Sequence, residues 1–169
     1  MAEARQVQAM PTAAGEFRVE PLTASDGPLV RECLYHAIHV SAGAAAPPRE
    51  VLDRPEIARY AAGWGRAGDL GVKALATDGE PVGAAWIRCL TADEPGYGYV
   101  DDRTPELGLA VLPEHRNRGI GTALLRELLA AAAAAGHRAV SLSVAQENPA
   151  VRLYARVGLS RWNAGGRRW

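Results

Sequence analysis

The stretch LAVLPEHRNRGIGTALL, which runs from Leu109 to Leu125, decides the fold of this chain. An apolar run stops at Pro113, a polar segment follows, and Gly119 and Gly121 introduce a second apolar run with helical periodicity. A strand that feeds such a turn into a helix leaves backbone N–H groups unpaired beside the positive end of the helix dipole. Phosphate binds at sites of this kind, and glycine lets the anion approach the amides. The stretch therefore predicts an anion-binding turn.

Two common phosphate motifs fit this turn poorly. A Walker P-loop needs a lysine after its glycines, and the only lysine of the chain is Lys73. A dinucleotide fingerprint fits Gly119 and Gly121 loosely, and it is expected early in a βαβ unit with an acidic ribose partner further on. A plain helix cap is the remaining alternative. The turn alone leaves phosphate binding and simple capping both open.

The rest of the chain reads as one domain of alternating strands and helices, residues 17–169, preceded by a disordered segment, residues 1–16. An Asp-Gly turn at Asp78 and Gly79 predicts a hairpin. The order β-α-α-β-β-β-α-β-α-β predicts an α/β (mixed α+β) fold with helices on both faces of a mixed sheet. Strands are expected at 17–22, 70–76, 81–90, 106–112, 139–145 and 159–163, and helices at 26–40, 53–62, 119–135 and 149–158.

Composition excludes several functional classes. The chain of 169 residues carries 19 basic and 19 acidic side chains, so no overall field attracts nucleic acid or an anionic membrane. Cys33 and Cys89 lack CxxC spacing, and the four histidines show no ligand spacing, so we expect no metal site. No apolar run resembles a signal peptide or spans a bilayer, and we expect a cytoplasmic protein.

Two motifs resemble those of the GNAT superfamily of acyl-CoA-dependent N-acetyltransferases. The acyl-CoA-binding core of that family, [QR]-x-x-G-x-[GA], reads here as Arg116 to Gly121. The sequence ENPAVRLYARVGL resembles the second motif, N-x-x-A-x-x-L-Y-x-x-x-G-F, with matches at Asn148, Leu153, Tyr154 and Gly158. The alanine comes early, at Ala150, and Leu159 replaces the final phenylalanine. The resemblance covers roughly residues 70 to 160, and the order of elements extends it to about residue 17.

The resemblance implies a mostly antiparallel central sheet that splays between its fourth and fifth strands, with acetyl-CoA as acyl donor. The pantetheine arm would lie along the central strand at Leu109, Ala110 and Val111, where one backbone amide polarises the thioester carbonyl. The two arginines of the turn would add charge near the phosphates, or simply be solvated. The amides that would hold the pyrophosphate belong to Arg116, Asn117, Arg118, Gly119, Ile120, Gly121 and Thr122.

The last helix supplies the expected general acid. Family members place a tyrosine at the position of Tyr154, where it protonates the departing thiolate. The alternative is a tyrosine packed in the core. Asn148 would either cap this helix or bond the pantetheine arm.

The expected base is Glu106, which enters the central strand and would take the proton of the amine directly or through water. Strand alternation makes Glu106 point opposite to Leu107 and Leu109. The alternative is a structural or surface carboxylate. Asp101 and Asp102 are reserve bases, and with four neighbours they would form an acidic, aromatic lip for a cationic amine, or only a hydrated loop. The four neighbours are Asp93, Glu94, Tyr97 and Tyr99.

These inferences predict an N-acetyltransferase that moves an acetyl group to a primary amine of a small molecule or peptide, by direct attack in a ternary complex. A non-catalytic acyl-CoA-binding sensor or scaffold is the alternative, and the presence of both Tyr154 and Glu106 favours the enzyme. The sequence does not identify the amine. The short C-terminus predicts a homodimer that covers an open sheet edge with Trp162, the alternative being a monomer with a folded-back tail.

Overall fold

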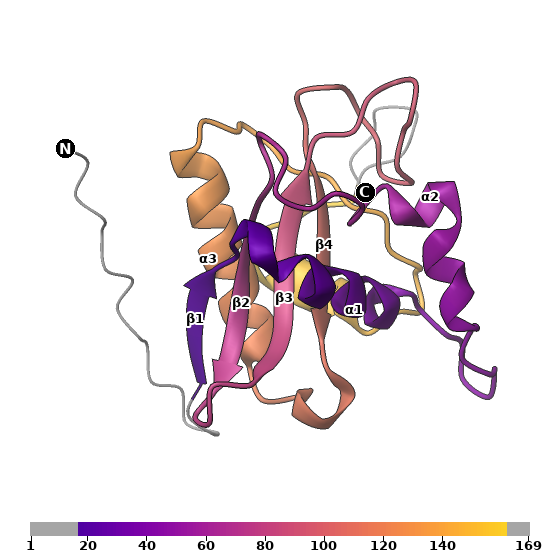
Figure 1. Ribbon diagram of the computed structural model, residues 1–169, viewed down its shortest axis with the longest axis vertical. Coiled ribbons are helices and arrows are strands. Elements are labelled where there is room, and N and C mark those ends of the chain that lie inside the picture. The colour runs from indigo at the N-terminus through magenta and orange to yellow at the C-terminus, as the bar shows by residue number, and fades with distance from the viewer. Residues whose placement is uncertain (1–16, 162–169) are drawn as a thin grey trace.

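The computed structural model describes residues 17–161, which form one four-stranded antiparallel sheet with helices on both faces (Figure 1). Neighbouring strands in the sheet are also neighbours in sequence, in the order β1-β2-β3-β4. The Asp-Gly hairpin is present, with Leu70 opposite Ile87 and Gly79 at a φ of 86° in the turn. The strands are β1 (Phe17–Pro21), β2 (Leu70–Ala76), β3 (Pro81–Arg88) and β4 (Glu106–Val111).

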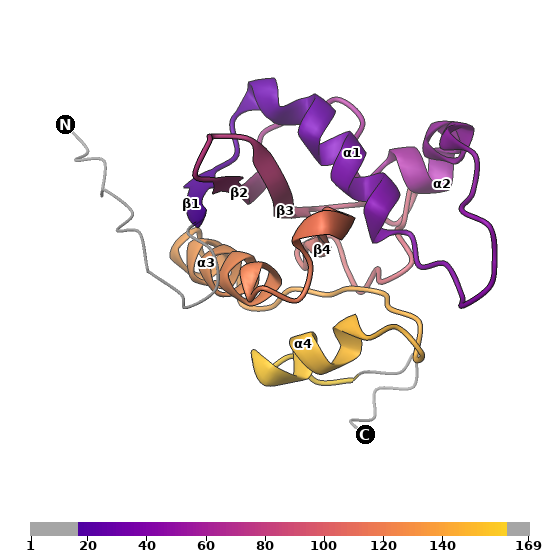
Figure 2. The ribbon, with the colours of Figure 1, turned by 90° about the horizontal axis from the view of Figure 1, so that it is seen from below.

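Two layers of helices enclose the sheet (Figure 2). Helices α1 (Gly27–Ala37) and α2 (Pro55–Ala58) lie on one side, and α3 (Ile120–Ala134) and α4 (Ala150–Arg156) lie on the other. Short 3₁₀ turns occupy Ala24–Asp26, Arg49–Asp53 and Pro113–His115. The expected mixed α+β class, with helices on both faces of an open and mostly antiparallel sheet, is confirmed.

Each face of the sheet has its own apolar core. The side chains of Leu124, Leu125 and Leu128 in α3 are fully buried against strand residues on one face. On the other face, Val30 and Cys33 of α1 pack with Trp86 of β3, and all three side chains are fully buried. The sheet therefore holds α1 and α3 at fixed positions on opposite sides of β4.

Several predicted boundaries were wrong. The first helix ends at Ala37 rather than Val40, where Ile38 takes an extended conformation and β-branched residues weaken helix formation. The second predicted helix, 53–62, is shorter: α2 begins only at Pro55, because Arg54 precedes a proline and is extended, and it ends at Ala58. A separate 3₁₀ turn at Arg49–Asp53 precedes it.

The fifth strand, predicted at 139–145, is reduced to one parallel bridge between Glu106 and Ser141. Gly98 lies against the peptide bond between Leu142 and Ser143, just after the bridge. A Cβ on Gly98 would stand 2.7 Å from the carbonyl carbon of Leu142 and 2.9 Å from the nitrogen of Ser143. The chain therefore diverges from β4 after the bridge, as the expected splay requires. Residues 159–161 form no strand, and the predictions for residues 1–16 and for Trp162 lie outside the described residues.

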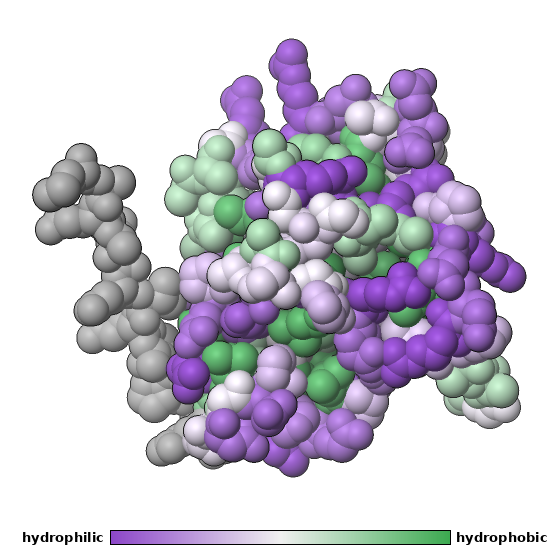
Figure 3. Space-filling view, in the orientation of Figure 1, coloured by the Kyte–Doolittle hydropathy of each residue, from purple (hydrophilic) through white to green (hydrophobic). Residues whose placement is uncertain are grey.

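Two surface properties follow from residues 17–161. No helix in this range has the length and apolar character needed to cross a membrane. On the face that carries α1, hydrophilic and apolar side chains are interspersed (Figure 3). A groove of about 400 Å³ lies between α1 and α2, and Arg31 is the only charged residue lining it. Without a second polar group for proton transfer, this groove is a weak candidate for a catalytic site.

Candidate active site

The site begins at the free edge of β4, the side of this strand with which no other strand of residues 17–161 pairs. Leu107 donates its N–H to the carbonyl of Ser141 at 2.8 Å, and Ser141 donates to the carbonyl of Pro105 at 3.0 Å. Backbone alternation turns the amides of Leu109 and Val111 to this same edge, beyond the point where the pairing stops. An extended ligand could therefore hydrogen-bond to β4 at these two residues.

The predicted contact at Ala110 does not lie on this edge. Leu112 donates its N–H to Val82 of β3 at 2.8 Å, so alternation turns the amide of Ala110 toward β3 as well. The Ala110 side chain is buried in the core beneath α1.

The free edge runs into the N-terminus of α3. Gly119 has a φ of 78°, a left-handed conformation that favours glycine, and no side chain caps the helix. The first helical hydrogen bond joins the N–H of Ala123 to the carbonyl of Gly119, at 3.1 Å. The amides of residues 120–122 precede it and have no acceptor within the described part of the chain. They are available to an anion.

The side chains of the turn differ in their surroundings. Arg116 and Arg118 are exposed, and the Nε of Arg116 donates to the carbonyl of Val111 at 3.0 Å. The Ile120 side chain is buried in the core, so only its amide faces the turn. Asn117, with a φ of 60°, and Thr122 complete the predicted set around the helix start.

Helix α4 lies next to this helix start. A Cβ on Gly121 would stand 3.1 Å from Cδ2 of Leu153, so the absence of a side chain lets the two helices approach closely. Tyr154 packs against the α3 core, and burial raises its pKa to about 12. The phenol is therefore protonated at neutral pH and can act as an acid. Asn148 accepts the N–H of Ala150 at 2.9 Å, which is a capping interaction.

Glu106 lies on the opposite face of β4 with only 2% of its surface exposed. Tyr60 donates its hydroxyl to Oε1 at 2.8 Å, and the N–H of Gly98 donates to the same oxygen at 2.8 Å. Oε2 has no hydrogen-bond partner among residues 17–161. A Cβ on Gly96 would stand 2.0 Å from Oε2, so the backbone of this loop lies directly on the carboxylate.

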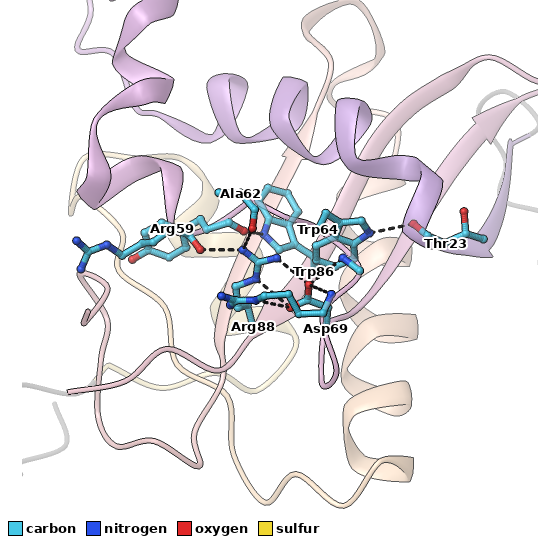
Figure 4. A network of polar contacts seen from close by, with 10 residues as sticks. Thr23, Arg59, Ala62, Trp64, Asp69, Trp86 and Arg88 are labelled. Atoms are coloured by element: carbon cyan, nitrogen blue, oxygen red, sulfur yellow. Dashed lines mark hydrogen bonds and ion pairs between the residues drawn. The ribbon is translucent and has the colours of Figure 1, made fainter. Parts of the chain in front are cut away.

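A buried ion pair supports the segment that carries Tyr60 (Figure 4). Arg88 of β3 binds Asp69 through two hydrogen bonds, of 2.9 and 2.7 Å, and donates to the carbonyls of Arg59 and Ala62 at 3.0 and 2.7 Å. Burial raises the pKa of Asp69, but the hydrogen bonds and charge of Arg88 outweigh it and hold that pKa below its ordinary value. The ion pair therefore fastens the turn after α2 to the sheet.

The acidic loop predicted as a substrate lip is held by its own carboxylates. Asp101 accepts the N–H groups of Arg103 and Thr104, each at 2.8 Å, and these bonds, that of Arg103 first, lower the pKa of Asp101. Tyr99 donates its hydroxyl to Asp102. Tyr97 is 65% exposed at the rim of the loop. Asp93 and Glu94 are exposed as well. Asp101 therefore serves the loop structure and is a poorer base than its position in sequence suggests.

Sequence reasoning missed the surroundings of Glu106. Tyr60 follows a short helix without any motif, and the segment PGYGY, residues 95–99, carries no known motif either. The signal available was the pair of glycines around Tyr97. Neither Gly96 nor Gly98 has a positive φ, so both are required by space rather than by conformation.

The comparisons with known proteins agree with this geometry. The acetyltransferase (GNAT) family profile matches residues 36–159, which is most of the chain. The chain belongs to the GNAT acetyltransferase family. A search of curated proteins finds no match of significance.

Solved structures show the same GNAT fold. A GCN5-related N-acetyltransferase from Ralstonia eutropha JMP134 is 23% identical, with a TM-score of 0.61 over 89% of this chain and 97% of the other. An aminoglycoside acetyltransferase from an uncultured soil metagenomic sample is 24% identical, with a TM-score of 0.57 over 88% and 94%. The yncA protein of Salmonella typhimurium, solved with its cofactor acetyl-CoA, is 20% identical, with a TM-score of 0.59 over 85% and 81%.

Proposed function

We propose that this protein is an acetyl-CoA-dependent N-acetyltransferase that acetylates a primary amine by direct attack within a ternary complex. The observation that carries the proposal is the free edge of β4, which leads directly into the uncapped N-terminus of α3 in a GNAT chain. Acetyl-CoA supplies an activated acyl group as a thioester. The remaining steps are argued from side chains and amides of this protein.

The pyrophosphate of the donor would bind the amides at the start of α3. These amides lack internal acceptors, and the helix dipole favours negative charge there. A Cβ on Gly119 would have no atom within 4 Å, so the approach to this turn is open. Arg116 and Arg118 are exposed beside it and would contribute charge-assisted hydrogen bonds.

The pantetheine arm would extend along β4. Leu109 and Val111 present their amides to the free edge, while their side chains pack into the core below α3. Hydrogen bonds to an extended amide-containing arm would mimic an added strand. One of the two amides would donate to the thioester carbonyl and stabilise the negative charge that develops on its oxygen during attack.

Tyr154 would act as the general acid. Its hydroxyl carries a proton at neutral pH, as an ordinary phenol does, and burial raises its pKa further, to about 12. As the carbon–sulfur bond breaks, the proton of Tyr154 would pass to the sulfur. The attached nitrogen would lose its second proton to solvent, and solvent would return a proton to Tyr154.

Glu106 would receive the proton that the amine must lose before it attacks. The carboxylate lies on β4 just before the free edge, and one of its oxygens has no hydrogen-bond partner among the described residues. Gly96 covers that oxygen, so direct contact with an amine requires a shift of residues 96–98, and a proton relay is the other route. Asp101 is the weaker candidate because the amides of its own loop already occupy it.

The acceptor would be a cationic amine of a small molecule or a peptide. The carboxylates of residues 93–102 are exposed on the loop next to Glu106, with Tyr97 beside them, and would attract a positive charge. A sensor that only binds acyl-CoA remains the second hypothesis, but it has no use for a buried carboxylate with an unpaired oxygen.

A thiol-release assay with acetyl-CoA and a panel of amines separates these hypotheses. The panel contains small amines, aminoglycosides, amino acids and peptides with free N-termini, and mass spectrometry identifies the acetylated product. The proposal predicts amine-dependent release of coenzyme A together with an N-acetylated product. Tight acetyl-CoA binding without turnover on any amine would support the sensor instead.

A further inference from the structure

The surroundings of Glu106 form a carboxylate cradle, which consists of Tyr60 and the backbone of residues 96–98. Tyr60 and Gly98 donate to the same oxygen, Oε1, and so fix the plane of the carboxylate and leave Oε2 as its one unpaired atom. The Tyr60 oxygen also accepts the N–H of Tyr97 at 2.7 Å, which joins the two halves of the cradle.

The backbone of Tyr60 is itself fixed from two sides. Trp86 of β3 donates its indole N–H to the Tyr60 carbonyl at 3.0 Å. Arg88 holds the carbonyls of Arg59 and Ala62, on either side of Tyr60 in sequence (Figure 4). Because its backbone is held in this way, Tyr60 presents its hydroxyl from a fixed position and can orient the carboxylate that it contacts.

The charged neighbour of Glu106 does not compete with Tyr60. Arg88 is its cross-strand partner in β3, but its guanidinium is directed to Asp69 and makes no ion pair with Glu106. The tyrosine hydroxyl and the Gly98 amide are therefore the groups that set the orientation of the carboxylate. Burial and the bond to Glu106 raise the pKa of Tyr60, which keeps the hydroxyl protonated as a donor.

We propose that Tyr60 is a positioning residue for the reaction: its hydroxyl holds Oε1 of Glu106 and thereby keeps Oε2 in the orientation that accepts the proton of the amine. This inference rests on the proposed function, because it assigns Tyr60 a part in the proton transfer to Glu106. It also explains Gly96 of PGYGY, since a side chain there would occupy the place of Oε2 and of the Tyr60 hydroxyl.

The test compares Tyr60→Phe with Glu106→Gln, the double variant and the control Tyr35→Phe. The control also removes a tyrosine hydroxyl with a 2.8 Å hydrogen bond, here to the carbonyl of Pro47 on the α1 side. The kinetic readouts are kcat, the KM for acetyl-CoA, and the pH dependence of kcat/KM with the best amine from the panel. Urea unfolding of all four variants gives a readout that needs no substrate.

Tyr60→Phe should lower kcat by about tenfold or more while the KM for acetyl-CoA stays unchanged. It should move the acidic limb of the kcat/KM profile up by about one pH unit, because a lost hydrogen bond disfavours the charged carboxylate. Tyr35→Phe should keep the wild-type profile. In the Glu106→Gln background, Tyr60→Phe should cause little further loss of rate, and the losses of stability should be less than additive.

Two results would separate the possible failures. An unchanged kcat and profile in Tyr60→Phe, with Glu106→Gln strongly impaired, would overturn the role of Tyr60 and leave the base assignment intact. A wild-type rate in Glu106→Gln would overturn the base assignment and the positioning role together. An equal loss of rate from Tyr60→Phe with and without Glu106 would also overturn the proposal.

Discussion

The ion pair beneath the candidate site gives the sharpest stability prediction. In Asp69→Asn the Arg88 guanidinium, 1% exposed, keeps its two carbonyl partners but loses the charge that neutralises it. Breaking a buried pair by removing one partner costs about 3–5 kcal/mol. The guanidinium binds both carboxylate oxygens, at 2.9 and 2.7 Å, which is the strong two-bond geometry of an arginine–carboxylate pair. We expect the free energy of unfolding to fall by about 3–5 kcal/mol.

Urea unfolding followed by tryptophan fluorescence measures this loss. Asp53→Asn is the matched control, because Asp53 pairs with Arg31 at 2.9 Å while the two side chains are 69% and 49% exposed. That exposed pair should contribute less than about 1 kcal/mol. The lowered pKa of Asp69 also predicts a pH dependence of stability. The ionised carboxylate stabilises the folded protein fully above the ordinary carboxyl pKa, and this stabilisation is lost as the pH falls through the lowered pKa of the folded state. Equal, small losses in the two variants would contradict a stabilising role for the buried ion pair.

Three further predictions concern α4 and its surroundings. Tyr154→Phe should keep the affinity for acetyl-CoA and lower turnover roughly a hundredfold in the thiol-release assay; wild-type turnover with chemistry rate-limiting would leave only a packing role. Because the Tyr154 pKa is raised to about 12, the phenol ionises earlier in the unfolded chain, so between about pH 10 and 12 stability should fall by up to about 1.4 kcal/mol per pH unit. In Tyr154→Phe the free energy of unfolding should fall less steeply with pH over this range, and an unchanged slope would contradict the burial of the Tyr154 hydroxyl. Asn148→Ala should lower the free energy of unfolding by about 1 kcal/mol, because the capping hydrogen bond is lost. If calorimetry also shows a weaker affinity for acetyl-CoA, Asn148 contacts the pantetheine arm as well.

The sequence predicted those parts of the fold that local chemistry determines. The apolar runs on either side of the Asp78–Gly79 turn predict a hairpin, and the structure contains it as β2 and β3. Pro113 and Gly119 delimit β4 and α3 in the same direct way. Each of these signals depends on a few neighbouring residues, so it can be recognised without knowledge of the tertiary structure.

Contacts between segments that are far apart in the sequence could not be predicted from it. The residues around Ser141 have strand-like alternation, yet they pair with β4 at one point only, and Gly98 packs against the residues that follow. Likewise, nothing near Tyr60 in sequence indicates that its hydroxyl reaches a carboxylate 46 residues away. The sequence predicts Glu106 as a base from its place at the start of the strand. Its burial and its hydrogen-bond donors depend on the path of residues 96–98, which carry no known motif.

The most direct test of the account is calorimetric titration of acetyl-CoA into Gly119→Asp and Gly136→Asp. Both glycines have positive φ values, 78° and 91°, and open space at the Cβ position, and they lie at opposite ends of α3. Aspartate tolerates this conformation and suits the dipole at the N-terminal end, so Gly119→Asp should fold well. We expect Gly119→Asp to weaken acetyl-CoA binding more than tenfold, which is about 1.4 kcal/mol. Gly136→Asp should bind like the wild type, and equal affinities in the two folded variants would contradict a pyrophosphate site at the start of α3.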